Sequence, residues 1–229
     1  FKQKTAYEIK ECDWSSDVCS SDLGCNDGVV LDIGANMGSF TIPLAFYNPQ
    51  FEFLCFEPQR MVFYQLCGNL ALNNLRNVQT FNFGLGDSAC KIEVSTPDYA
   101  AEENIGAFSL DEEVRNHEDY LCKTSGNTEH ITIYKLDDSL IIRNIRLIKI
   151  DVEGMELNVL KGAVETIKNN NYPHIIFEAW QGKEWFLPRR DELYKFLEEL
   201  GYEITCTGED NYAIHKSHKG SEEDSKEGS

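Results

Sequence analysis

The sequence lacks the features that would place this protein in a membrane or on nucleic acid. None of its apolar runs reaches the roughly 20 residues that a membrane-spanning helix needs. Basic residues are scarce, because 21 Lys and Arg stand against 39 Asp and Glu and leave a net charge of −18. Such an excess of negative charge disfavours nonspecific binding to nucleic acid. We therefore expect neither a membrane span nor a nucleic-acid partner.

The eight cysteines include no Cys-x-x-Cys pair, and Cys55 falls within a predicted buried strand. This usage suits free thiols in a reducing compartment, so we expect a cytoplasmic protein. The chain begins at Phe1 without a signal-peptide pattern, which leaves open that it is a fragment whose true start is missing. Its 229 residues, 41% hydrophobic and 11% aromatic, suffice for one sizeable core and predict a single domain.

Both ends of the chain differ in composition from the part between them. Residues 11–22 show no helical or strand periodicity and resemble translated sequencing-adaptor text, in which case Cys12 and Cys19 carry no biology. With Cys25 these cysteines hint at a metal site, but no second Cys/His cluster completes it. We expect residues 1–23 to lie outside the core as an artefactual segment, residues 24–215 to form the domain, and residues 216–229 to be a disordered polar tail.

What the chain does contain is a series of five short apolar runs, each of which stops at or beside an acidic residue. The acids are Asp32, Glu57, Asp87, Asp151 and Glu178. Apolar runs separated by helical patterns are typical of buried parallel strands, whose ligands bind beyond the carboxyl ends. The acids should therefore meet at one edge of the sheet, where they suit a cation with ribose hydroxyls and an amino group. S-adenosylmethionine, a sulfonium, fits that description.

Helical patterns follow four of the five runs. We expect Ser39 to cap the first helix, Pro58 to start the second, Leu160 to Ile167 to share one apolar stripe, and Gly201 to end the last. The third of the five strands is predicted at residues 78–85, two added strands at 91–95 and 131–136, and a closing hairpin at 202–206 and 212–215. The count is five parallel strands plus a terminal antiparallel pair.

Several ordered motifs carry a family resemblance. They are Val-Leu-Asp-Ile-Gly-Ala-Asn-Met-Gly, Phe-Glu-Pro, Gly-Leu-Gly-Asp, Leu-Ile-Lys-Ile-Asp-Val-Glu-Gly-Met-Glu and Val-Leu-Lys-Gly-Ala. Together they strongly resemble the FkbM family of S-adenosylmethionine-dependent methyltransferases, from about Asp27 to Trp180. The resemblance implies an α/β, Rossmann-like class I methyltransferase fold, with a seven-stranded, mostly parallel sheet that ends in an antiparallel hairpin. It also implies O-methylation of a hydroxyl on a small molecule, glycan or polyketide-like acceptor. Residues 97–128 depart most from the pattern, so the acceptor stays open.

The predicted cofactor site begins at the glycine turn. Gly34 and Gly38 would let the backbone approach the cofactor, although a tight turn alone would also use them. Asp32 would orient the methionine amino group, directly or through water, and Glu57 would accept both ribose hydroxyls. Asn36 either holds the turn or meets the ligand.

Leu85 and Asp87 are predicted to meet the adenine, although Gly-Asp is also a common turn pair. A dinucleotide site normally has the pattern Gly-x-Gly-x-x-Gly, whose middle glycine is Asn36 here. This disfavours a nucleotide-binding oxidoreductase, which stays open as an alternative beside an inactive S-adenosylmethionine-binding module.

Asp151 and Glu153 are the predicted catalytic residues, because methyl transfer to a hydroxyl needs an aligned acceptor and a group that takes its proton. If the chain stays extended, residues i and i+2 point into the same cleft. The alternatives are that Glu153 caps the next helix and Asp151 only satisfies backbone donors. Two carboxylates without a nearby His are weak evidence for Mg²⁺, so we expect no metal. His174 precedes its strand and should lie at the opposite edge.

Overall fold

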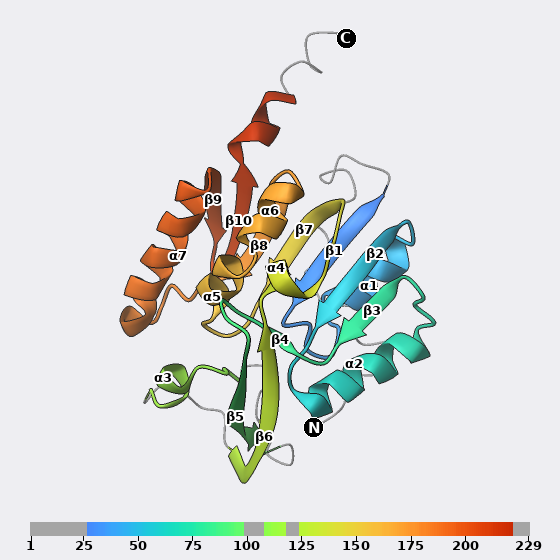
Figure 1. Ribbon diagram of the computed structural model, residues 1–229, viewed down its shortest axis with the longest axis vertical. Helices are drawn as coiled ribbons and strands as arrows, with labels where there is room; N and C mark the ends of the chain where they lie inside the picture. The colour runs from blue at the N-terminus through green and yellow to red at the C-terminus, as the bar shows by residue number, and fades with distance from the viewer. Residues whose placement is uncertain (1–26, 99–107, 118–123, 222–229) are drawn as a thin grey trace.

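The computed structural model describes residues 27–98, 108–117 and 124–221 of the chain (Figure 1). Seven of its strands build the main sheet: β1 (Gly28–Ile33), β2 (Phe51–Phe56), β3 (Val78–Phe81), β7 (Ile145–Ile150), β8 (His174–Glu178), β9 (Tyr202–Thr207) and β10 (Asp210–His215). They lie in the order β3-β2-β1-β7-β8-β10-β9. The first five are parallel, whereas β10 is antiparallel to both β8 and β9. The predicted class I methyltransferase sheet with its terminal hairpin is confirmed.

Helices cover both faces of this sheet. They are α1 (Thr41–Tyr47), α2 (Arg60–Leu72), α4 (Leu136–Ser139), α5 (Glu156–Lys161), α6 (Val164–Asn169) and α7 (Leu187–Glu199). Val30 of β1 packs in one cluster with Ala45 of α1, while the next residue, Leu31, packs in another with Leu197 of α7. Because helices cover both faces of β1, its residues Val29, Val30 and Leu31 form a continuous apolar run.

The helix boundaries differ from the predictions at three places. Ser39 does not cap α1, because the N-cap is Phe40 and no side chain bonds there. The second helix starts at Arg60, two residues after Pro58. The stripe from Leu160 to Ile167 spans two helices, α5 and α6, with a break at Gly162. A Cβ atom on Gly162 would lie 1.9 Å from the carbonyl oxygen of Gly86, so the chain approaches a neighbouring loop where the helix is interrupted.

Other predicted elements are confirmed. Val62, Leu66 and Leu70 are the buried residues of α2. Gly201 follows α7 with φ +94°, a left-handed conformation that glycine adopts without strain.

The predicted strand 78–85 is split between two sheets. β3 ends at Phe81, and residues Gly84–Leu85 form β4, which pairs with β6 (Thr124–Tyr134) instead. β6 also pairs with β5 (Cys90–Pro97), so the second sheet has the order β4-β6-β5. Figure 1 shows β5 and β6 extending away from the main sheet. Strands near β5 and β6 were predicted, but their pairing in a separate sheet with β4 was not.

The ends of the chain give a mixed outcome. Residues 1–23, with Cys12 and Cys19, lie outside the described residues. Lys216–Ser221 forms a 3-10 helix, η4, so the prediction of disorder is wrong for that part of the tail, and residues 222–229 lie outside the described residues. Within the described ranges, four cysteines are free and no helix is long and apolar enough to cross a membrane.

Candidate active site

Two clefts open beside the carboxyl ends of the parallel strands. The first, here the glycine-turn cleft, has about 630 Å³ of unfilled space including its mouth. Its lining is Ile33, Gly34, Asn36, Phe56, Glu57, Pro58, Gln59, Gly84, Leu85, Phe108, Leu110, Asp151, Val152, Glu153 and Met155. The second, here the Lys149 cleft, has about 650 Å³ by the same measure. Its lining is Ser39, Phe40, Lys149, Ile150, Asp151, Ile176, Phe177, Glu178 and Asp210. Asp151 is common to both linings.

The glycine turn is fixed by close contacts with its neighbours. A Cβ atom on Gly34, which has φ +81°, would lie 1.8 Å from the backbone oxygen of Asp151. Asn36 also has a positive φ, 50°, and its Oδ1 accepts a hydrogen bond from the Met37 N–H at 2.8 Å. Gly38 does not line the cleft, and a Cβ there would meet Ile42 and Leu66 at 3.0 Å or less. Gly34 and Asn36 therefore border the cleft, whereas Gly38 makes room for helix packing.

Glu57 joins the glycine turn to the start of α2. One carboxylate oxygen accepts the Asn36 N–H at 3.0 Å and the other accepts the Gln59 N–H at 2.8 Å. The residue is only 4% exposed, yet it borders the cleft. Burial raises the pKa of Glu57 to about 7, although the two backbone hydrogen bonds work in the opposite direction. The carboxylate that was predicted to bind ribose thus also holds the turn.

Asp32 is fully buried and borders neither cleft. Its Oδ2 accepts the Thr41 hydroxyl hydrogen bond at 2.7 Å, and its Oδ1 lies 3.2 Å from the Nζ of Lys149. Asp32 therefore lies behind the cleft lining and supports Lys149, and its predicted contact with the methionine amino group, directly or through water, stays a prediction.

Lys149 was not singled out from the sequence, although a lysine within the apolar run of β7 is an unusual signal. Its ammonium group donates to the Gly34 carbonyl at 3.0 Å and lies 3.2 Å from both Asp32 and Asp151. Burial alone would lower the pKa of Lys149, but the two carboxylates outweigh burial and raise it. The lysine therefore stays charged and links the ends of β1 and β7.

Asp151, Glu153 and Glu178 come together as an acidic cluster, with one carboxylate oxygen of each within 4.8 Å of the others. The predicted reason is wrong, because Glu153 has φ 54° and lies in a turn instead of an extended chain. Glu153 is not a helix cap either, since α5 has Met155 as its N-cap. The turn is held by buried Glu156, whose Oε1 accepts the N–H groups of Val152 at 3.2 Å and Gly154 at 3.1 Å.

Two members of the acidic cluster have raised pKa values. Burial, followed by the negative charges of Asp151 and Glu156, raises the pKa of Glu153 to about 8. Burial, followed by the negative charges of Asp151, Glu153 and Glu156, raises the pKa of Glu178 to about 9. At neutral pH both carboxyls are mostly protonated, and Lys149 already pairs with Asp151. The cluster can therefore balance its charge with protons, and the prediction that no metal binds stays a prediction.

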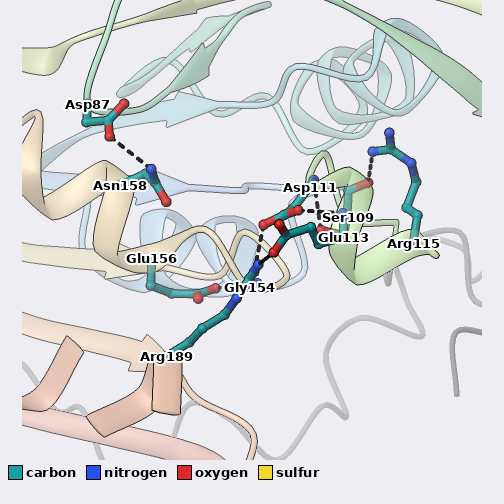
Figure 2. Close-up of polar contacts among 9 residues, drawn as sticks. All are labelled: Asp87, Ser109, Asp111, Glu113, Arg115, Gly154, Glu156, Asn158 and Arg189. Atoms are coloured by element: carbon teal, nitrogen blue, oxygen red, sulfur yellow. Dashed lines mark hydrogen bonds and ion pairs between the residues drawn. The ribbon is translucent and has the colours of Figure 1, made fainter. Parts of the chain in front are cut away.

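The two predicted adenine contacts are separated. Leu85 borders the glycine-turn cleft, but Asp87 does not. The exposed Asp87 carboxylate accepts a hydrogen bond from Asn158 Nδ2 at 3.0 Å (Figure 2). It also accepts one from Ser88 Oγ at 3.1 Å.

Residues 108–117, here the cover segment, complete one wall of the glycine-turn cleft. Phe108 and Leu110 border the cleft, and the short helix α3 (Glu112–Arg115) follows them. Arg189 of α7 donates to Asp111 at 2.6 Å and also to Glu113 (Figure 2). Behind this ion pair, Val114 packs against Trp180 and Phe186. Contacts with the main domain thus include the Arg189 ion pairs and this apolar cluster.

Comparison with known families and proteins agrees with this architecture. The family described as "Methyltransferase FkbM domain" matches residues 32–204, more than half of the chain. Methyltransferase 1 of Beauveria bassiana (strain ARSEF 2860) is 28% identical over 149 residues, which is 60% of this chain and 59% of that protein. Methyltransferase sdnD of Sordaria araneosa is 28% identical over 208 residues, covering 77% of this chain and 74% of the relative.

Among solved structures, the chain is similar to precorrin-6y C5,15-methyltransferase from Geobacter metallireducens, with a TM-score of 0.49 and 17% identity. The match covers 86% of this chain and 84% of that one. A SAM-dependent methyltransferase from Aquifex aeolicus gives a TM-score of 0.44 at 13% identity, over 85% and 84% of the two chains.

Proposed function

Because the chain belongs to the FkbM methyltransferase family, we propose that it transfers the methyl group of S-adenosylmethionine and holds this cofactor in the glycine-turn cleft. The observation that carries the proposal is the position of Glu57 between the glycine turn and that cleft. A carboxylate has about four lone-pair sites, and backbone N–H groups occupy two of them here. The remaining sites can accept the two ribose hydroxyls.

The acceptor is proposed to bind in the Lys149 cleft. Asp151 borders both clefts, so a donor in one and an acceptor in the other would meet beside its carboxylate. The Lys149 cleft also presents Glu178 and Asp210, whose carboxyls disfavour an anionic acceptor and can hydrogen-bond hydroxyl groups. These features support O-methylation of a hydroxyl on a small molecule or glycan, with the polyketide-like class included.

The bound cofactor would supply an already activated methyl carbon, so the chain has to align the acceptor and take one proton. Glu153 is the candidate base, because burial and neighbouring acids raise its pKa to about 8, close to neutral pH. Asp151, held by Lys149 at 3.2 Å, is placed to orient the acceptor hydroxyl. Asp151 would thus orient the acceptor hydroxyl, and Glu153 would take its proton as the cofactor supplies the methyl group to the hydroxyl oxygen.

The binding proposal is tested by calorimetry with S-adenosylmethionine, S-adenosylhomocysteine and NAD. We expect both methionine derivatives to bind and NAD to give no heat, because Asn36 replaces the glycine that a dinucleotide site needs. Tight NAD binding without a response to either derivative would instead support the oxidoreductase alternative.

A further inference from the structure

Gln59 presents an unused hydrogen-bonding group at the wall of the glycine-turn cleft. The residue is 6% exposed and borders the cleft. Its Oε1 is buried without a hydrogen-bond partner among the described residues. Buried polar groups are almost always paired, so an unpaired amide oxygen at a cleft wall indicates a missing partner. Sequence reasoning did not identify this residue.

The backbone around Gln59 is fixed by the carboxylate that we propose to hold the ribose. Gln59 is the N-cap of α2, and its N–H donates to Glu57 Oε1 at 2.8 Å. A ligand whose ribose contacts Glu57 would therefore place its base within reach of the Gln59 side chain. Leu85, Phe108 and Leu110 supply apolar lining for a flat ring in the same cleft.

We propose that the Gln59 amide recognises the hydrogen-bonding edge of the adenine, an inference that rests on the proposed function. A primary amide combines an acceptor with a donor, and adenine offers an amino donor beside a ring-nitrogen acceptor. The Gln59 Oε1 accepts from the 6-amino group, and its Nε2 donates to the neighbouring ring nitrogen. Asp87, the residue predicted for this contact, is exposed and bonded to Asn158.

The test compares two ligands on two proteins by calorimetry. The ligands are S-adenosylhomocysteine and its purine analogue without the 6-amino group, and the proteins are the wild type and Gln59→Leu. We expect the wild type to bind the analogue about 10- to 100-fold more weakly, because a site built for a hydrogen bond rejects a ligand that lacks it. Gln59→Leu should bind both ligands with similar affinity. Gln79→Leu, a substitution of an exposed glutamine in β3, should discriminate like the wild type.

The outcomes separate this inference from the proposed function. Equal affinity of the wild type for the two ligands would overturn the role of Gln59 while leaving S-adenosylhomocysteine binding intact. A folded Gln59→Leu that discriminates between the ligands as strongly as the wild type would also overturn the role of Gln59. If the leucine variant does not fold, Gln59→Met takes its place in the comparison. If the wild type binds no S-adenosylhomocysteine, the proposed function and this inference both fail.

Discussion

Lys149 is the residue that joins the acidic ends of two central strands. Its ammonium contacts Asp32, Asp151 and the Gly34 carbonyl within 3.2 Å. A buried charge is costly unless it is paired and hydrogen-bonded, and this one is both. The positions of Asp151 and of the glycine turn are therefore coupled through one side chain, which fixes the border between the two clefts.

Asp151 and Glu153 should separate catalysis from cofactor binding. We expect Asp151→Asn and Glu153→Gln to leave S-adenosylhomocysteine affinity nearly unchanged. Both should lower turnover by about 10² to 10⁴, because Asp151 orients the acceptor hydroxyl and Glu153 takes its proton. Wild-type turnover should rise with pH towards about 8, where Glu153 ionises. The measurements are calorimetry and a methyl-transfer assay with an identified acceptor.

Two results would contradict that account. Full turnover in both amide variants would remove these residues from the mechanism and leave alignment by the clefts as the source of rate. If Asp151→Asn lowers both the melting temperature and the cofactor affinity, Asp151 has a structural role. Its contact with Lys149 is consistent with that role.

At the residue scale, the sequence predicts where a side chain lies when the end of a strand decides its position, whereas the role of that side chain stays a prediction. Glu57 and Asp151 reach the glycine-turn cleft because each directly follows a parallel strand. Asp87 does not reach it, because a tertiary contact with Asn158 holds its carboxylate elsewhere, and nothing local in the sequence encodes that contact. Gln59 could not be identified from the sequence, because only the folded structure shows that its Oε1 is buried without a hydrogen-bond partner among the described residues.

At the scale of elements, the cover segment connects α7 to the lining of the glycine-turn cleft. Its residues Phe108 and Leu110 border the glycine-turn cleft, and Arg189 of α7 attaches it through Asp111 and Glu113. The Arg189 side chain is 32% exposed, so its ion pairs add little stability but still restrict where the segment lies.

Arg189→Ala should therefore weaken cofactor binding more than it weakens the fold. We expect S-adenosylhomocysteine affinity to fall about three- to tenfold, with a loss of roughly 1 kcal/mol or less in unfolding free energy. Calorimetry and thermal melting measure the two effects. Arg189→Lys should recover part of the affinity, because one ammonium can still pair with Asp111. Arg190→Ala is the control, since Arg190 bonds to Gln181 and Asp191 instead, and equal behaviour of the two alanine variants would refute the role of Arg189.

Among the elements, the main sheet could be predicted from the sequence, but the split of residues 78–85 and the helix break at Gly162 could not. Apolar runs and glycine turns are local signals, and they placed all five parallel strands and the hairpin. The split of residues 78–85 depends on pairing with Ile133 and Tyr134, almost fifty residues later in the chain. The break at Gly162 likewise depends on the approach of Gly86.

At the scale of the whole molecule, acids with raised pKa values gather at one edge of the sheet. Burial raises the pKa of Glu57 and Glu156 to about 7, and burial with like charges raises those of Glu153 and Glu178 to about 8 and 9. The folded state therefore binds more protons than the unfolded state between about pH 4.5 and 9. By linkage, the free energy of unfolding falls as pH rises through that window.

We expect the melting temperature to fall by several degrees between pH 5 and pH 9. Glu178→Gln should flatten this decline, because a neutral amide has no proton to lose. Glu198→Gln, on the exposed surface of α7, should keep the wild-type slope. Differential scanning calorimetry in matched ionic strength provides the comparison, and identical slopes for Glu178→Gln and the wild type would contradict the assignment.

The central claim is that the cleft beside Glu57 holds the methyl donor, and titration of S-adenosylhomocysteine into wild type and Glu57→Ala tests it most directly. Loss of charge-assisted ribose hydrogen bonds should cost about 1.5 to 3 kcal/mol, which is roughly a 10- to 150-fold weaker affinity. Glu52→Ala, an exposed position in the same strand, should bind like the wild type. Unchanged affinity in a Glu57→Ala protein that melts cooperatively would show that the donor is held elsewhere.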